Sequence, residues 1–224
     1  MSDRSDQFPG IETVRLFPLP NVVLLPNGLL PLQIFEPRYK QMMEDVLADD
    51  RRMAIVLIKE PGPPEPTPIH PVACVGEVFN ERRLPDGRFL FVLRGQARVR
   101  IDHEIETERL YRTAKVDVLE DELLPQGDMG RKLFQAEILR CLRILLANDD
   151  DADAFMGFLS QECRPGPFSD IVAYTARLSP ATKQRLLETT SVDDRLQQLQ
   201  EHLQEVTQGA DDADPNDPRH FSKN

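Results

Sequence analysis

The spacing of apolar residues changes near residue 120, and this change constrains the fold more than any single motif. Residues 13–119 form short apolar runs separated by proline and glycine, a pattern typical of strands joined by turns. Residues 128–206 repeat their apolar side chains at spacings of three and four, which is typical of amphipathic helices. A chain of 224 residues is long enough for one large domain or for two small ones sharing an interface.

The first part of the chain predicts an antiparallel curled sheet or small barrel. A Pro26-Asn27-Gly28 turn, a Pro85-Asp86-Gly87 turn and a bulge or bend at Gly95 divide the apolar runs. A helix with one apolar face is expected to begin near Pro37, because proline suits the first helical position. The expected strands cover residues 13–19, 29–35, 53–58, 73–79, 89–93, 97–101 and 111–119, with a further strand-like run at 21–25. A proline-rich surface loop is expected over 61–71.

The second part predicts a set of helices with recognisable caps. Asp128, Ser169, Ser179 and Ser191 are each expected to begin a helix, and a shorter helix is expected over 152–159. The last helix carries a narrow apolar seam, which could pack within the chain or against a second chain. Packing within the chain is favoured, because two heptads are short for a free coiled coil. The seam consists of Val192, Leu196, Leu199, Leu203 and Val206.

Composition argues against several classes of function. The net charge of −11 opposes binding to nucleic acid through phosphate contacts, although it leaves room for a local basic patch. The N-terminal ten residues lack the basic start and apolar stretch of a signal peptide, and no apolar run reaches the roughly 20 residues needed to cross a bilayer. We therefore expect a soluble cytoplasmic protein. The cysteines are 3 in number and far apart, which predicts free core residues rather than a disulfide framework.

No familiar catalytic, cofactor-binding or metal-binding motif occurs in the sequence. Ser179 and Lys183 are four residues apart, as a Ser–Lys pair could be, but a helix cap explains Ser179 better. His70 with Cys74, and the acidic run from Asp149, lack the further ligands of a metal site. We expect no catalytic residue, no cofactor and no metal. Arg94, Arg98 and Arg100 could form a basic patch, and the alternative that they face solvent or pair with carboxylates is favoured.

One long block is more specific than these patterns. Residues 17–39 read FPLPNVVLLPNGLLPLQIFEPRY, and VGEV at 75–78, DGR at 86–88 and LRGQARV at 93–99 follow in order. This series resembles the N-terminal substrate-binding domain of Lon proteases, and the resemblance extends through the helices to about Val206. It covers nearly all of the chain that is expected to fold.

The resemblance implies an α+β fold in which a PUA-like curled antiparallel sheet, or pseudo-barrel, is followed by a helical bundle. We expect the β-domain, with one helix, over 11–120, the bundle over 126–207, and a disordered acidic tail over 208–224. Full Lon proteases carry an ATPase and a Ser–Lys protease module after this domain. We expect a stand-alone member without either module, and therefore no enzyme; Ser179 and Lys183 do not correspond to the Lon dyad.

The resemblance also implies a non-catalytic module that engages unfolded or partner proteins, as a monomer or weak homo-oligomer, with no membrane partner. Met42, Met43 and Ile69 are candidate contact residues, because flexible or exposed apolar side chains suit varied partners. The family-motif residues are expected to maintain the fold: Glu36, Pro37, Arg38, Tyr39, Gly76, Gly87, Gly95 and Arg98. Two alternatives stay open: an RNA-binding PUA-like module, which needs a contiguous basic face, and an undetected hydrolase, which needs a nucleophile, a base and an orienting group in one cleft.

Overall fold

The computed structural model describes residues 11–60, 62, 66–125, 127–147, 149–161 and 163–211. The chain divides into two compact units, each built from two segments. Unit 1 comprises Met1–Glu122 and Asp170–Thr190, and unit 2 comprises Leu123–Ser169 and Ser191–Asn224. This differs from the expected division, because residues 170–190 group with the sheet and not with the other helices.

Unit 1 is built around a six-stranded sheet whose strands follow the predicted alternation. The strands are β1 (Thr13–Leu19), β2 (Leu29–Ile34), β3 (Arg52–Leu57), β4 (Val72–Arg83), β5 (Phe89–Ile105) and β6 (Thr113–Leu119). The two runs expected on either side of Gly95 form the single long strand β5. The run at 21–25 is not a strand; it belongs to the loop between β1 and β2.

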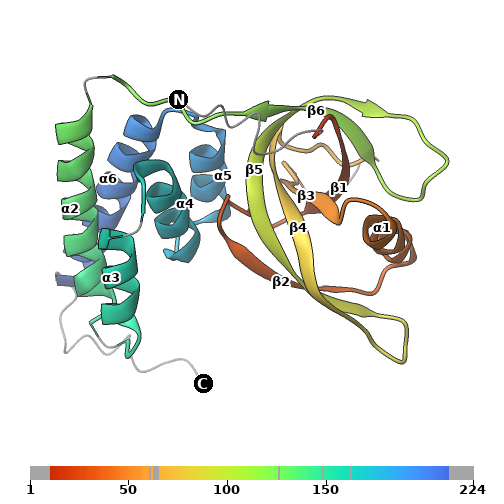
Figure 1. Cartoon of the computed structure of the whole chain (residues 1–224), viewed down its shortest axis with the longest axis horizontal. Helices are drawn as coiled ribbons and strands as arrows, with labels where there is room; N and C mark the ends of the chain where they lie inside the picture. The colour runs from red at the N-terminus through yellow and green to blue at the C-terminus, as the bar shows by residue number, and fades with distance from the viewer. Residues whose placement is uncertain are drawn as a thin grey trace. The chain divides into compact units, whose positions relative to one another are not determined.

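The sheet closes on itself, as the resemblance implies. Its strand order is β2-β5-β4-β3-β1-β6, and the later part of β5 also pairs with β6, which completes a ring of five strands. β2 pairs with the first part of β5. β4 and β5 lie side by side as two long, curved strands (Figure 1). β1 and β3 pair in parallel, whereas the other neighbouring strands are antiparallel. The fold is therefore a curled β pseudo-barrel with one parallel pair.

The core of unit 1 lies inside this ring. Side chains of Val14 and Leu16 on β1 meet those of β3, β4, β5 and β6, where small residues such as Ala54 and Ala73 allow the strands to approach closely. Alternate residues along each strand face this core, which explains the period of two in the sequence. The core is continuous across every strand of the ring.

Two helices accompany the sheet in unit 1. α1 (Pro37–Ala48) begins with Pro37 in its first turn, as expected, and buries the face that carries Tyr39 and Val46. α5 (Pro180–Glu188) begins at Pro180, and the hydroxyl of Ser179 accepts a hydrogen bond from the Thr182 amide. The predicted cap at Ser179 is therefore confirmed.

Unit 2 is helical. It contains α2 (Asp128–Leu145), α3 (Ala152–Gln161) and α6 (Val192–Asp211), while α4 (Pro165–Thr175) runs across the division between the units in the sequence. α2 and α6 lie side by side (Figure 1). Four residues of the predicted seam on α6 are buried, whereas Val206 is exposed. Packing of the seam within the chain is confirmed for four residues, Val192, Leu196, Leu199 and Leu203.

Two of the predicted caps are wrong. Asp128 is the first residue of α2, and Gly127 occupies the cap position. Ser169 lies inside α4, where its hydroxyl donates to the carbonyl of Gly166. The helix starts earlier because Pro165 suits a first helical turn. At α6, the Asp194 amide donates to the Ser191 hydroxyl, so the cap predicted there is confirmed.

Parts of two expected segments fall outside the described residues. In the proline-rich loop, residues 61 and 63–65 lie outside them, and Ile69 forms a bridge with Ile58. The expected tail begins within α6, which extends to Asp211, and residues 212–224 lie outside the described part of the chain.

Candidate functional site: an apolar groove in unit 1

The loop between β1 and β2 is held directly against β5. Asn27 adopts a left-handed conformation with φ of 66°, and the Gly28 amide closes the predicted turn by donating to the Leu25 carbonyl at 3.0 Å. The Asn27 amide donates to the Gly95 carbonyl, and the Gly95 amide donates to the Gly28 carbonyl, both at 2.9 Å. A Cβ at Gly95 would lie 2.1 Å from the Leu25 carbonyl oxygen, so glycine is required for this close approach.

Tyr174 of α4 packs over the same loop. A Cβ at Gly28 would lie 2.8 Å from the Tyr174 ring, which shows how closely the ring rests on the loop backbone. The Tyr174 hydroxyl donates to the Leu29 carbonyl at 2.7 Å, at the first residue of β2. One side of the loop is therefore fixed by β5 and the other by α4.

Lys183 lies on α5 beside this tyrosine. Its ammonium donates to the Tyr174 carbonyl at 2.7 Å and lies 5.3 Å from the centre of the Tyr174 ring. The side chain is half-buried, and this burial lowers the pKa of Lys183 below its ordinary value. No carboxylate pairs with it among the residues that the structure describes.

These elements enclose an apolar groove of about 410 Å³, which we call the α5 groove. The β1–β2 loop and β2 form one side, and the end of α4 with the start of α5 forms the other. Of its described lining residues, Lys183 alone is charged. The lining consists of Asn21, Val22, Val23, Leu30, Tyr174, Thr175, Leu178, Pro180 and Lys183.

The outer edge of β2 is poorly suited to bind an added strand. β2 pairs with β5 alone, so every second residue directs its backbone away from the sheet. The Leu29 carbonyl points outward and already accepts the Tyr174 hydroxyl, and the next outward residue, Pro31, has no amide hydrogen. Two successive positions of this edge are therefore unable to pair with an added strand.

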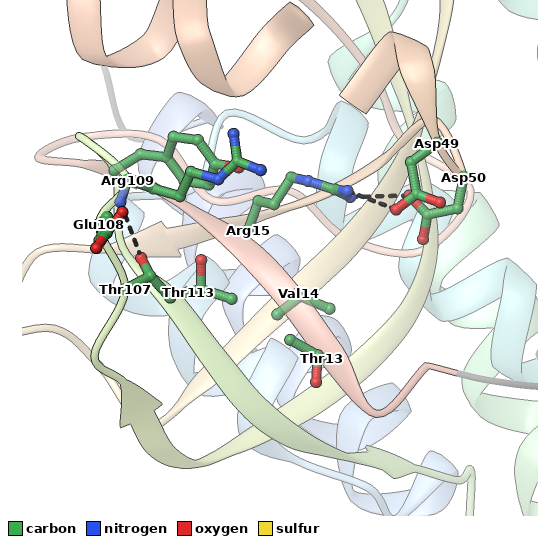
Figure 2. Close-up of a pocket in the computed structure, with 10 residues that line it drawn as sticks. Thr13, Val14, Arg15, Asp49, Asp50, Thr107, Glu108, Arg109 and Thr113 are labelled. Carbon is green, nitrogen blue, oxygen red and sulfur yellow. Dashed lines mark hydrogen bonds and ion pairs between the residues drawn. The ribbon is translucent and has the colours of Figure 1, made fainter. Parts of the chain in front are cut away.

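Unit 1 contains a second pocket of about 450 Å³, lined largely by charged and hydroxyl side chains, which we call the charged pocket. Figure 2 shows Arg15 of β1 directed toward Asp49 and Asp50, which follow α1. The guanidinium donates to Asp49 at 2.5 Å and to Asp50 at 3.0 Å. These contacts raise the pKa of Arg15, although burial acts in the opposite direction.

The other arginine of the charged pocket is also neutralised within the protein. Arg109 donates to both carboxylate oxygens of Asp45 at 3.0 and 2.8 Å, and the Tyr111 hydroxyl donates to the same carboxylate at 2.7 Å. Its backbone amide donates to the Thr107 hydroxyl (Figure 2). Both cations of this pocket are therefore already paired, which distinguishes it from the α5 groove.

The structure corrects the two methionine candidates. Met42 and Met43 have 0% exposed surface and lie in the core on the buried face of α1. Buried thioethers fill the core and cannot form an accessible surface in the folded unit. Ile69 is half-buried and packs against the core of the ring beside its bridge to Ile58, so it offers little free surface.

The residues around the start of α1 have structural partners. Glu36 precedes the helix, and the Arg38 guanidinium donates to its carboxylate at 2.9 Å. Arg38 also lies 4.6 Å from the centre of the Tyr39 ring, and Tyr39 in turn packs on Phe17 of β1. These contacts fix the junction between β2 and α1, as expected of an arginine that reaches back to the carboxylate.

The three motif glycines allow close packing or a positive φ angle. A Cβ at Gly76 would lie 2.6 Å from the Leu93 side chain on the neighbouring strand. Gly87 has φ of 79° in the β4–β5 turn, a conformation that side-chain-bearing residues rarely adopt. Together with Gly95, these positions require the absence of a side chain.

Arg98 is buried and pairs with carboxylates, which agrees with the favoured alternative to a basic patch of strand arginines. It is 3% exposed, donates to both oxygens of Asp170 and to the Leu187 carbonyl, and forms an ion pair with Asp121 at 3.5 Å. Burial disfavours its charge, but the two carboxylates outweigh this effect and raise the pKa of Arg98. Arg94 pairs with Glu77 at 2.8 Å on the surface. Arg98 thus ties the start of the 170–190 segment to β5 within unit 1.

The described residues do not assemble a hydrolytic or metal centre. Ser179 uses its hydroxyl as a helix cap, and burial raises the pKa of the Cys74 thiol, which makes a thiolate nucleophile unfavourable. No group of three metal-ligating side chains occurs in the part of the chain that the structure describes. In that same part, no helix is long and apolar enough to cross a membrane.

Most of the α5 groove could not be predicted from the sequence. Lys183 stood out only as a possible partner of Ser179, and Tyr174 carried no signal because a tyrosine on a helix usually belongs to its packing face. The sequence does contain separate signals: Gly28 and Gly95 allow close contacts, and Lys183 lies near the start of a helix without an acidic residue in its first turn. Their assembly depends on α4 and α5 reaching the β1–β2 loop from a distant part of the sequence.

Comparison with known proteins places these features in a family. Residues 13–205 match the sequence model of the ATP-dependent protease La (LON) substrate-binding domain. The chain is 26% identical over 194 residues to a Lon protease of Dictyoglomus thermophilum and 28% identical over 184 residues to one of Azospirillum brasilense. These alignments cover 86% and 81% of this chain, but 24% and 22% of the relatives. The chain thus spans about a quarter of the length of these relatives.

Solved structures share the fold. The N-terminal domain of a Mycobacterium avium complex Lon protease matches with a TM-score of 0.69 and 18% identity, covering 86% of this chain and 98% of that one. A Lon N-terminal domain protein from Xanthomonas campestris matches with a TM-score of 0.59 and 22% identity, covering 84% and 97%. Because the family model covers most of the chain, the chain belongs to the Lon substrate-binding domain family.

Proposed function

We propose that this chain is a non-catalytic module that binds segments of unfolded or partner proteins, and that the α5 groove is the contact surface. The observation that carries the proposal is a preformed apolar groove in a member of a substrate-binding domain family. Its volume of about 410 Å³ falls within the range of ligand pockets, about 300–1,000 Å³. Its walls are held by hydrogen bonds, so little ordering accompanies binding.

Two observations weigh against the alternative functions. An RNA-binding face would need Arg94 and Arg98, but Arg94 pairs with Glu77 and Arg98 is buried against Asp170. A hydrolase would need a free nucleophile beside a base, whereas the Ser179 hydroxyl already accepts the Thr182 amide. Protein binding needs neither a basic face nor a reactive group.

Calorimetric titration with a permanently unfolded protein tests the proposal. Reduced and carboxymethylated lactalbumin would be added to the full 224-residue chain and to two variants, Val22→Asp in the groove and Leu110→Asp outside it. Val22 lines the groove, whereas Leu110 is 62% exposed elsewhere in unit 1. We expect binding to the native chain, at least roughly tenfold weaker binding to Val22→Asp, and unchanged binding to Leu110→Asp.

The two variants distinguish binding in the groove from non-specific binding to exposed apolar side chains. Equal loss in both variants would indicate that any exposed apolar side chain contributes, and would remove the groove from the proposal. If the native chain bound neither this protein nor a second unfolded one, the proposed function would be wrong. Circular dichroism of each variant would check that the fold is retained.

A further inference from the structure

Lys183 is half-buried and contacts no carboxylate among the described residues. The net charge is −11, and three of the buried or half-buried arginines, Arg15, Arg98 and Arg131, each contact two carboxylates. Lys183 contacts only a backbone carbonyl and an aromatic ring among the described residues. An ammonium has three donors, and the Tyr174 carbonyl occupies one of them. Lys183 is therefore able to bind a further acceptor in the groove that it lines.

The start of α5 adds to this positive potential. Pro180 and Lys183 of its first turns both line the α5 groove, and no acidic residue occupies the first turn. The N-terminal end of a helix carries a partial positive charge, which an acidic first turn would ordinarily balance. The amides of Thr182 and Lys183 are used by Ser179, so the helix contributes through its dipole and Lys183 contributes the direct donors.

Most of the other lining residues are apolar, and Asn21, Tyr174 and Thr175 are the polar uncharged ones. Val22, Val23, Leu30, Leu178 and Pro180 surround the single charge, and no carboxylate is found among the described lining residues. A complementary ligand must therefore combine an apolar group with a negative charge at short range. In an extended peptide, successive side chains point in opposite directions, so an acidic side chain and its apolar neighbour would not enter one pocket together. The last residue of a chain carries its apolar side chain and its carboxylate on the same Cα.

We infer that the α5 groove captures the free C-terminus of a protein chain that ends in an apolar residue, with Lys183 binding the terminal carboxylate. This inference rests on the proposed function and specifies its ligand. Asn21 at the rim can hydrogen-bond the peptide backbone, because its amide has both donors and an acceptor. Capture of a C-terminal carboxylate, for example in a nest of backbone amides, is a recurring mode of peptide recognition, and here the Lys183 ammonium would supply the donors.

Fluorescence anisotropy with one labelled peptide in several forms tests the inference. The probe is Gly-Ser-Gly-Ser-Ala-Leu-Val-Leu with a free carboxylate, and the matched probe is the same peptide with a C-terminal amide. A third probe is amidated and carries an aspartate before its last leucine. The full chain is compared with Lys183→Gln and with Lys59→Gln, an exposed lysine of unit 1 outside the groove.

We expect the native chain to bind the free acid about tenfold more tightly than either amidated probe, since a charge-assisted hydrogen bond is lost in both. Lys183→Gln should reduce free-acid binding to the level of the amide, and Lys59→Gln should change neither. A purely structural role of Lys183, as a cap on the end of α4, would not make the native chain distinguish acid from amide. This comparison decides the matter even if Lys183→Gln folds poorly.

Two results would overturn the inference. Equal binding of acid and amide by the native chain would exclude a role for the carboxylate, and equal binding of the internal aspartate probe would assign the charge to a side chain. In either case, continued binding of unfolded lactalbumin that depends on Val22 would leave the proposed function intact. If neither peptides nor unfolded protein bound, both the inference and the proposed function would be wrong.

Discussion

The charged pocket and the α5 groove are of similar volume and lie in the same unit, yet their cations have different kinds of partner. In the charged pocket, Arg15 and Arg109 are paired with carboxylates on the neighbouring α1 and the turn that follows it. In the α5 groove, Lys183 has a carbonyl and a ring as its described partners. A paired cation holds elements together, whereas a cation without a carboxylate partner keeps its charge available to a ligand.

The first prediction tests the structural side of this comparison and has the largest expected effect. Arg98→Met would remove the buried guanidinium that pairs with the carboxylates of Asp170 and Asp121. Removing one partner of a buried ion pair costs about 3–5 kcal/mol, so we expect a loss of this size in the free energy of unfolding measured in urea. The control is Arg100→Met on the same strand, where an exposed side chain should change stability by less than about 0.5 kcal/mol. Similar losses in both variants would contradict the structural role of Arg98.

The second prediction concerns the wall of the α5 groove. Gly95→Ala would place a methyl group against the Leu25 carbonyl oxygen and force the β1–β2 loop away from β5. We expect a loss of about 1–3 kcal/mol in thermal or urea unfolding, together with weaker peptide binding. Gly130→Ala in α2 is the matched control: nothing lies near its added methyl, and alanine favours a helix by about 0.5–1 kcal/mol over glycine. A Gly95→Ala chain as stable as the native one would show that the loop has room to shift.

The third prediction has the smallest effect and sharpens the contrast between the pockets. Arg15→Gln removes two ion pairs whose carboxylates are largely exposed, and such pairs contribute about 0.2–1 kcal/mol. Unfolding should show a loss in this range, while binding of the free-acid peptide should stay unchanged. If Arg15→Gln weakened that binding as much as Lys183→Gln, the two pockets would not differ in function as proposed.

Much of the fold could be predicted because local chemistry and global packing agree. Alternating apolar residues identified the strands, and Ser179 with Pro180 marked the start of α5. The periodicity that defined the buried face of α1 also contained Met42 and Met43, and their burial follows from it. Their flexibility suggested contact residues, but their position in the apolar stripe of α1 places them in the core.

The candidate site was harder to predict because its parts are distant in sequence. Arg94, Arg98 and Arg100 lie at even spacings on one strand, so their spacing does not distinguish Arg98 from the other two. The buried partner of Arg98, Asp170, is 72 residues away. Tyr174 meets Leu29 across 145 residues. Helical periodicity predicts which face of α5 is buried, but it carries no information on the element that buries it.

The return of residues 170–190 to unit 1 has a consequence for the order of events during synthesis. The strands of the ring are synthesised before residues 170–190. The ion pair between Arg98 and Asp170 cannot form until the 47 residues Leu123–Ser169 of unit 2 have been made. Domains generally fold as they emerge, from the N-terminal end onward. Here unit 1 is complete only when α5 has emerged. A nascent chain that stalls within α2 or α3 would therefore expose Arg98 without Asp170, together with the β1–β2 loop side of the α5 groove.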